Sequence, residues 1–373
     1  MPVTMETLLH PTQVRKVVSE IRSPINRLTA FYGLGPDGTN TEQVAGKSFS
    51  WDQFNAVRTI ATGRPAGTGP ARITPQIVGN VAARAYRAFE AVPLLYERIY
   101  RNRPIGGPFP SGELDTNGVR YITAQQERLG QRFLNNREFM VSRMLRGSGF
   151  QIKIDGDTMV PVDSGGAISV TYNVPAGNIG TVNGIFAGNW QTAASAVPHD
   201  EVLALNAYSE QLSGLPIEHA WLNSVTWSKL LKTDQVKTLA GSSNQPFATY
   251  DRVSITGADG RQTTELTAML RGIPWVTWHI NDAVLNVNGS DSKIWPDNRV
   301  GFTPSPSSEW LAMVEGDELV RPNLGSESIL TVNGFGAWTT PTMDPAGVEL
   351  KAIDICLPAL YIPTAIFYAT VAA

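Results

Sequence analysis

Two short glycine-containing segments are the first candidates for chemistry, because glycine-rich loops can cradle phosphate groups. Residues 33–38 read GLGPDG and match the spacing of a dinucleotide-binding loop, but they lack the strand and helix that such a loop needs on either side. Residues 41–48 read TEQVAGKS and offer the Gly, Lys and Ser of a phosphate loop without its first glycine. Both segments are therefore interpreted as turns, and no cofactor is predicted.

The side chains that most often perform catalysis are scattered along the chain. No two of its four histidines lie within four residues of each other, so no pair has the spacing of a metal site. The single cysteine, Cys356, lies in an apolar tail, and no serine has the glycine-flanked setting of a hydrolase nucleophile. We predict neither a catalytic residue nor a metal, although distant residues can converge in an active site. The histidines are His10, His199, His219 and His279.

The segment between Asp52 and Glu90 is the most unusual part of the 373-residue chain. Its 37 residues contain five arginines but no lysine and no acidic residue, and they are rich in Gly, Pro, Ala and Thr. Such a composition cannot bury enough apolar surface to hold the segment in place by itself. We expect its arginines to contact acidic groups of a second subunit; they are Arg58, Arg64, Arg72, Arg84 and Arg87.

The distribution of charge supports self-association. The net charge is −3, but residues 1–150 hold 19 basic and 11 acidic residues, whereas residues 151–373 hold 11 basic and 22 acidic residues. The two parts therefore carry +8 and −11. A chain polarised in this way can attract copies of itself, or it can present its basic half to a polyanion.

The elements that flank the arginine-rich tip predict a β-hairpin. Residues 54–62 and 77–89 read as its two legs, while a helix that begins at Pro75 after Thr74 is the alternative. A leg of about 15 residues spans roughly 50 Å, far more than the radius of gyration of about 21 Å of a compact chain of this length. We therefore expect residues 53–89 to overhang their own subunit and to lie on a neighbouring copy.

The clearest predicted element is an amphipathic helix over residues 123–146. Thr123 and Gln126 have the spacing of a capping box, and Gly147 suits the end of the helix. A helix of this length measures roughly 36 Å. Its apolar face is formed by Leu129, Phe133, Met140, Met144 and Leu145.

The rest of the chain alternates between helix and strand patterns. Residues 150–163 predict a hairpin, followed by a helix ending at Gly214, a strand, a helix capped by Asn223 or Ser224, and a further strand at residues 273–280. This order indicates an α/β layer in the middle of the chain, followed by short strands punctuated by Gly and Pro.

The apolar tail, residues 355–373, is the only candidate for a membrane span. Pro358 and Pro363 would break a spanning helix twice, and no basic anchor follows them. We predict two short buried strands there, and no membrane association.

This order of elements resembles that of the major capsid proteins of tailed bacteriophages, most closely the lambda-type major capsid protein group. Three stretches carry the resemblance. Residues 120–147 resemble the spine helix of that family, and residues 206–236 resemble the helix, strand and helix of its axial domain. Residues 293–302, KIWPDNRVGF, are similar to a strand-bordering Pro-Asp-Asn segment in the same domain.

The resemblance implies an α+β fold of the Hong-Kong-97-type capsid class, with an arm, an extended hairpin loop, a peripheral domain with a long spine helix, and an α/β axial domain. The division that we predict is residues 1–50 for the N-terminal arm, 51–92 for the extended loop, 93–175 and 346–373 for the peripheral domain with its spine helix at 123–146, and 176–345 for the axial domain.

The resemblance also implies a function without catalysis. The chain would form the hexamers and pentamers of an icosahedral shell that encloses packaged double-stranded DNA, with scaffolding, portal and decoration proteins as further partners. It would belong to the virion and be assembled in the host cytoplasm. Four arginines of the spine helix are expected either to face DNA on the inner surface or to form ion pairs within the shell: Arg128, Arg132, Arg143 and Arg146.

Two features of the sequence refine this expectation. Some relatives bond a loop lysine to a neighbour's asparagine, but this loop has no lysine, so we predict no such covalent link. About 50 residues precede the loop, which favours a separate scaffolding protein over a long cleaved segment. The alternatives are an encapsulin-like nanocompartment shell and a soluble α/β enzyme whose site is not visible in the sequence.

Overall fold

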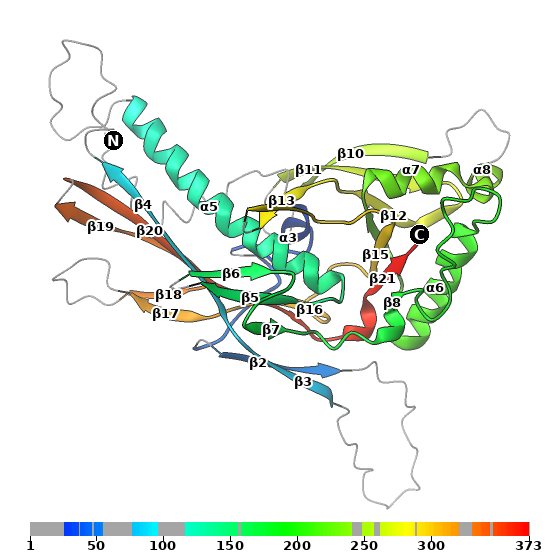
Figure 1. Cartoon of the computed structure of the whole chain (residues 1–373), viewed down its shortest axis with the longest axis horizontal. Coiled ribbons are helices and arrows are strands. Elements are labelled where there is room, and N and C mark those ends of the chain that lie inside the picture. Colours follow the sequence, from blue (N-terminus) through cyan, green and yellow to red (C-terminus); the bar gives the residue numbers. More distant parts are fainter. Residues whose placement is uncertain are drawn as a thin grey trace, which may run out of the picture.

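The computed structural model describes residues 26–36, 38–46, 48–54, 77–95, 116–155, 158–240, 248–256, 262–287, 289–320, 330–343 and 346–372. These residues form an elongated α+β molecule with a large sheet toward each end (Figure 1). The predicted fold class is therefore confirmed.

Helix α5 (Thr116–Leu145) is the longest element and runs along one side of the peripheral half of the molecule (Figure 1). It begins seven residues before the predicted start, so Thr123 lies inside the helix and does not cap it. The predicted end is confirmed, because Gly147 has a φ of 67°, the left-handed conformation that favours glycine after a helix. All five residues of the predicted apolar face are buried.

Helix α5 packs on a five-stranded sheet. Strand β20 (Ala346–Leu360) is central and is long enough to pair with three neighbours along its 15 residues. The remaining strands are β1 (Thr41–Gln43), β16 (Leu311–Glu315), β19 (Phe335–Met343) and β4 (Tyr86–Leu95). Because β4 belongs to this sheet, the second predicted hairpin leg ends earlier than residue 89.

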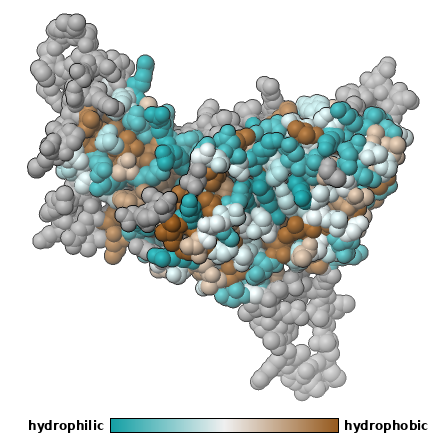
Figure 2. Space-filling model, in the orientation of Figure 1, coloured by the Kyte–Doolittle hydropathy of each residue, from teal (hydrophilic) through white to brown (hydrophobic). Residues whose placement is uncertain are grey.

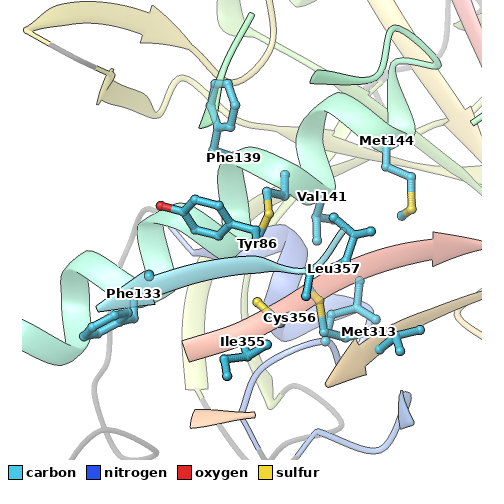
Figure 3. Packing of buried hydrophobic residues seen from close by; sticks show 14 of the residues in the cluster. Tyr86, Phe133, Phe139, Val141, Met144, Met313, Ile355, Cys356 and Leu357 are labelled. Atoms are coloured by element: carbon cyan, nitrogen blue, oxygen red, sulfur yellow. The ribbon is translucent and has the colours of Figure 1, made fainter. Parts of the chain in front are cut away.

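The core between α5 and the sheet is apolar and closely packed. Phe133 of α5 meets Phe335 of β19 edge to face, with ring centroids 5.6 Å apart. Val141 of α5 lies over the strands that carry Leu357 and Met313, all fully buried (Figure 3). Burial of such side chains stabilises the fold by about 1.5–3 kcal/mol each.

A seven-stranded sheet forms the axial half, and it is covered by α6 (Pro198–Leu212), α7 (Ser224–Lys232) and α8 (Asp234–Ala240). The predicted cap is confirmed, since the Asn223 side chain accepts a hydrogen bond from the Thr226 N–H at 2.9 Å. In order, the strands are β10 (Ala248–Thr256), β11 (Gln262–Leu270), β12 (Ile273–Ile280), β9 (His219–Leu222), β15 (Arg299–Thr303), β21 (Phe367–Thr370) and β8 (Ile179–Gly180).

Smaller elements join these halves. A three-stranded sheet contains the predicted hairpin at residues 150–163, and two-stranded ribbons lie beside both large sheets. They are β5 (Phe150–Asp155), β6 (Thr158–Val162) and β7 (Ile168–Val170); β13 (Val284–Val287) and β14 (Ser290–Lys293); β17 (Asp317–Val320) and β18 (Leu330–Asn333); and β2 (Ser48–Phe54) and β3 (Ile77–Arg84), with 3-10 turns at Ala176–Asn178 and Pro363–Ala365.

Sheet membership differs from the predicted domain division in two places. Strands β16 and β19 lie in the peripheral sheet, although residues 176–345 were assigned to the axial domain. Strand β21 lies in the axial sheet, although residues 346–373 were assigned to the peripheral domain. Buried apolar strands can pair in either sheet, so hydrophobicity does not identify which one they join.

The apolar tail forms strands β20 and β21, as predicted. Residues 355–360 and 367–371 are almost entirely buried between the layers. In the portion of the chain that the structure covers, no helix has both the length and the apolar character needed to cross a bilayer.

Candidate assembly surfaces

The predicted hairpin exists, and it replaces the alternative helix that would begin at Pro75. Strands β2 and β3 pair antiparallel, from Ser48 opposite Arg84 to Phe54 opposite Ile77. The first leg therefore begins at Ser48, earlier than predicted, and residues 55–62 of the predicted leg lie outside the described residues. The tip with Arg58, Arg64 and Arg72 lies outside the described residues.

The base of the hairpin is fixed to its own subunit. The Trp51 indole donates to the Leu360 carbonyl at 3.2 Å, and the buried Gln53 amide donates to the Tyr172 and Leu360 carbonyls at 2.8 and 3.1 Å. The expectation that residues 53–89 are completed by a neighbour is therefore wrong for both ends of this range. Buried amides that find carbonyl partners hold the hairpin base without any second copy.

The two described loop arginines have different settings. Arg87 lies on β4 and pairs with Glu318 of the same chain, donating to its two oxygens at 2.6 and 2.9 Å. Its guanidinium also lies 5.0 Å from the centroid of the Phe89 ring. Glu318 therefore pairs with Arg87 within the chain, and contact of Arg87 with a second subunit stays a prediction. Arg84 ends β3 and is exposed to solvent.

The four spine-helix arginines are divided between surface and interior. Arg128 is exposed, and Arg132 has a side chain that is 69% exposed and pairs with Glu90. Arg143 and Arg146 are buried, so the expectation that they face a lumen or DNA is wrong.

Burial of the last two arginines comes from the β13–β14 ribbon and the loop after β6. Arg143 pairs with Asp163 and donates to the Ser292 hydroxyl at 2.8 Å, while Arg146 donates to the Ile294 carbonyl. Burial, together with nearby Arg143, lowers the pKa of Arg146 to about 10. They follow Met140 by three and six residues, but six residues is not a same-face spacing and Arg146 lies beyond the end of α5, so the sequence offered no clear signal of their burial.

A buried ionic cluster centred on Arg137 was not predicted from the sequence. Its guanidinium donates to both Asp354 oxygens at 2.9 and 2.6 Å and to Glu315 at 2.8 Å, and the three side chains are at most 2% exposed. Burial alone would lower the pKa of Arg137, but the Asp354 and Glu315 carboxylates outweigh it and raise the pKa well above the ordinary value. The cluster joins α5 to β20 and β16. Arg137 follows Phe133 by four residues on the apolar face, which is the signal that could have indicated it.

A second unpredicted cluster holds the N-terminal helix α3 (Arg27–Phe31) on α5. The buried Glu138 carboxylate accepts hydrogen bonds from the backbone N–H groups of Leu28 and Thr29, both at 2.9 Å. It also accepts one from the Thr29 hydroxyl at 3.0 Å. Glu138 thus satisfies donors at the start of α3 that have no partner within a helix.

One cavity of about 420 Å³ opens between α5 and the strands β4, β6 and β13. Its lining includes the polar residues Glu90, Arg132, Asn135 and Asn136 and the apolar residues Met159 and Leu285. On the face shown in Figure 2, apolar residues lie in several separate patches among hydrophilic ones. Among the described residues, no group of three or more His, Cys, Asp or Glu side chains could hold a metal ion.

Comparison with known proteins identifies the fold. No family model and no curated protein matches the sequence. A solved structure assigned as the capsid protein of an Escherichia coli CFT073 prophage is similar over 100% of both chains, with a TM-score of 0.56 and 11% identity. The chain has the fold of that capsid protein.

Two further solved structures are also similar. A phage-related protein from Bordetella bronchiseptica RB50 has a TM-score of 0.47 and 11% identity, with 100% of this chain and 98% of the other covered. The SrpI encapsulin of Synechococcus elongatus PCC 7942 has a TM-score of 0.40 and 12% identity, with 98% and 96% covered.

Within this capsid-type fold, α5 occupies the place of the predicted spine helix, and the seven-stranded sheet with its three helices forms the predicted axial half. The arginine-rich tip connects the two hairpin strands, β2 and β3, whose last described pair is Phe54 and Ile77 (Figure 1). Surfaces available for contact with other copies therefore include this hairpin and the exposed Arg84.

Proposed function

We propose that the chain is the structural subunit of an icosahedral shell, in which copies arranged as hexamers and pentamers enclose packaged double-stranded DNA. The observation that carries this proposal is the similarity to a prophage capsid protein over the full length of both chains. The similarity covers 100% of each chain, so the shared fold extends over all the residues compared. The subunit performs no catalysis in this function, and its place is the virion, after assembly in the host cytoplasm.

Assembly would depend on many weak contacts that symmetry repeats. The hairpin base is held on its own subunit by Trp51 and Gln53, and residues 55–76 connect its two strands. The tip carries Arg58, Arg64 and Arg72, and residues 151–373 supply the excess of acidic side chains. Attraction between the tip of one copy and acids of the next would make assembly sensitive to salt.

Contact with DNA would be non-specific. Arg128 and Arg132 are the spine-helix arginines that remain candidates, because their side chains are exposed, while Arg143 and Arg146 are satisfied inside the subunit. Exposed arginines reduce repulsion between a protein surface and phosphates. Scaffolding, portal and decoration proteins are the further partners of such a shell.

Imaging of the purified full-length chain by negative-stain electron microscopy tests this function. We expect closed particles of uniform size, whereas a monomer or small oligomer without particles would contradict the proposal and favour a soluble enzyme. Absorbance of native particles at 260 and 280 nm then distinguishes the two kinds of shell. DNA-filled capsids absorb strongly at 260 nm, and a nanocompartment filled with protein does not.

A further inference from the structure

Residues 26–34, which we call the clamp segment, bond to both halves of the molecule. On the peripheral side, the Glu138 carboxylate of α5 accepts hydrogen bonds from α3. On the axial side, the Arg27 guanidinium donates to the Ile280 carbonyl of β12 at 2.9 Å. The Tyr32 hydroxyl lies 2.7 Å from the Thr303 hydroxyl of β15. The clamp segment therefore links elements that are far apart in the sequence.

A pair of histidines lies under the clamp segment. His219 and His279 come from the neighbouring parallel strands β9 and β12, and His219 Nδ1 lies 3.0 Å from His279 Nε2. The Phe31 ring of α3 meets both imidazoles edge to face, with centroids 4.8 and 5.0 Å away. Trp221 stacks on His279 with 4.1 Å between centroids and also contacts Phe31 edge to face at 5.3 Å. The pair is thus enclosed by aromatic rings, one of which belongs to the clamp segment.

The contact between the two imidazoles depends on their protonation. One ring nitrogen must donate and the other must accept, so a pair in which both rings are fully protonated cannot form this hydrogen bond. A first extra proton also places a charge in an apolar site. Burial, and then the proximity of His279, lowers the pKa of His219 from 6.5 to about 3. Between pH 6.5 and about 3, the subunit whose clamp segment is bound to the axial sheet, the closed state, therefore binds fewer protons than one whose clamp segment is released, the open state.

The sign of the pH effect follows from this difference. A histidine whose pKa is depressed in the closed state stabilises that state fully above pH 6.5, and the contribution is lost progressively as the pH falls toward 3. Each pH unit in this window changes the closing equilibrium about tenfold when one proton is taken up.

Other charged groups also lie near the pair. Arg27 of α3 adds a positive charge that opposes a further proton on the rings. Glu218 directly precedes β9 and is hydrogen-bonded to the Ser305 hydroxyl, while Glu138 accepts hydrogen bonds from α3. Variants of His219 therefore distinguish a response of the histidine pair from a response of these carboxylates.

We propose that the His219–His279 pair is an acid-sensitive switch that releases the clamp segment from the axial sheet when the rings become protonated. Release would detach Phe31 and α3 from strands β9 and β12 and loosen the connection between the peripheral and axial halves. The switch is a property of the single subunit, so it does not depend on shell formation.

Hydrogen–deuterium exchange of the full-length chain between pH 7.5 and 5.0, corrected for the intrinsic pH dependence of exchange, tests the switch. We expect peptides covering residues 27–34 to lose protection by roughly 15-fold between pH 6.5 and 5.0, because the slope of about tenfold per unit is reached only below pH 6.5. Peptides from α5 and β20 serve as the internal reference and should stay protected. His219→Phe keeps an aromatic ring but cannot titrate, so its protection should not change with pH. The control His199→Phe, on α6 beside Asp200, should respond like the wild type.

Two results would overturn the switch. One is unchanged protection of the clamp segment in the wild type over the whole range. The other is a loss that α5 and β20 peptides share equally, which would indicate global acid unfolding. If His219→Phe lacks protection at pH 7.5, His219→Gln replaces it, since an amide can still bond to His279. A wild-type pH response in a folded His219 variant would also count against the proposal.

Discussion

Arg137 on helix α5 donates two hydrogen bonds, of 2.9 and 2.6 Å, to the carboxylate of Asp354 on strand β20, and both side chains are buried. Arg137 also pairs with Glu315, so one buried cation is shared by two buried carboxylates in the peripheral core. Such a cluster gives geometric definition more than net stability, because taking the charges out of water is costly.

Removal of this single cation should destabilise the subunit strongly. Arg137→Ala leaves the Asp354 and Glu315 carboxylates buried without their cation, and we expect a loss of about 3–5 kcal/mol in the free energy of unfolding. Urea denaturation of the full chain measures this loss. Arg132→Ala is the matched control, because its pair with Glu90 is largely exposed and should cost less than about 1 kcal/mol. Equal losses in the two variants would show that the cluster has no special role.

The apolar face of α5 should not tolerate a charge. Leu129 is 2% exposed, and Leu129→Asp would bury a carboxylate without a partner, so we expect no cooperative unfolding transition in circular dichroism. Arg128→Asp, at the adjacent exposed position, places the same charge in solvent. Its free energy of unfolding should be within about 1 kcal/mol of the wild-type value. A normal melt of Leu129→Asp would contradict the packing described for this helix.

Charge reversal at the hairpin tip should separate folding from assembly. We expect Arg58→Glu, Arg64→Glu and Arg72→Glu together to block particle formation, while the subunit remains folded and soluble, because the hairpin base is fixed by its own chain. Electron microscopy and circular dichroism provide the two measurements. Reversal of Lys232 and Lys237 on the axial helices tests whether any loss of positive charge has the same effect. Normal particles from the triple variant would exclude the tip as an essential contact.

The single thiol should be inert in the native subunit. Cys356 is fully buried, and burial, followed by the charge of Asp354, raises the pKa of its thiol well above the ordinary value. Because the thiolate is the reactive form, we expect modification by a disulfide reagent at pH 8 to be slower by at least about a hundredfold than in urea. Absorbance of the released thiol measures both rates. Rapid reaction of the folded chain would show that β20 opens readily.

Local patterns in the sequence predicted the elements whose signals are local. The α5 face at Leu129 and Phe133, the helix stop at Gly147 and the cap at Asn223 all follow from periodicity or from the chemistry of one position, and the structure has each of them. The hairpin was likewise expected, although its first leg begins earlier than predicted, since the alternation that defines a strand also continues into flanking residues.

Only the tertiary structure decided which side chains meet across the fold. Nothing local to Arg137 names Asp354, 217 residues away, and nothing local to Arg143 distinguishes a surface arginine from one paired with Asp163 under a ribbon. The same holds for His219 and His279, which become neighbours because β9 and β12 lie side by side. Sequence determined where helices and strands form and that the arginine-rich tip lacks its own counter-charges. Long-range pairing of strands then decided which polar groups were buried together, because a buried charge persists only where the fold supplies its partner.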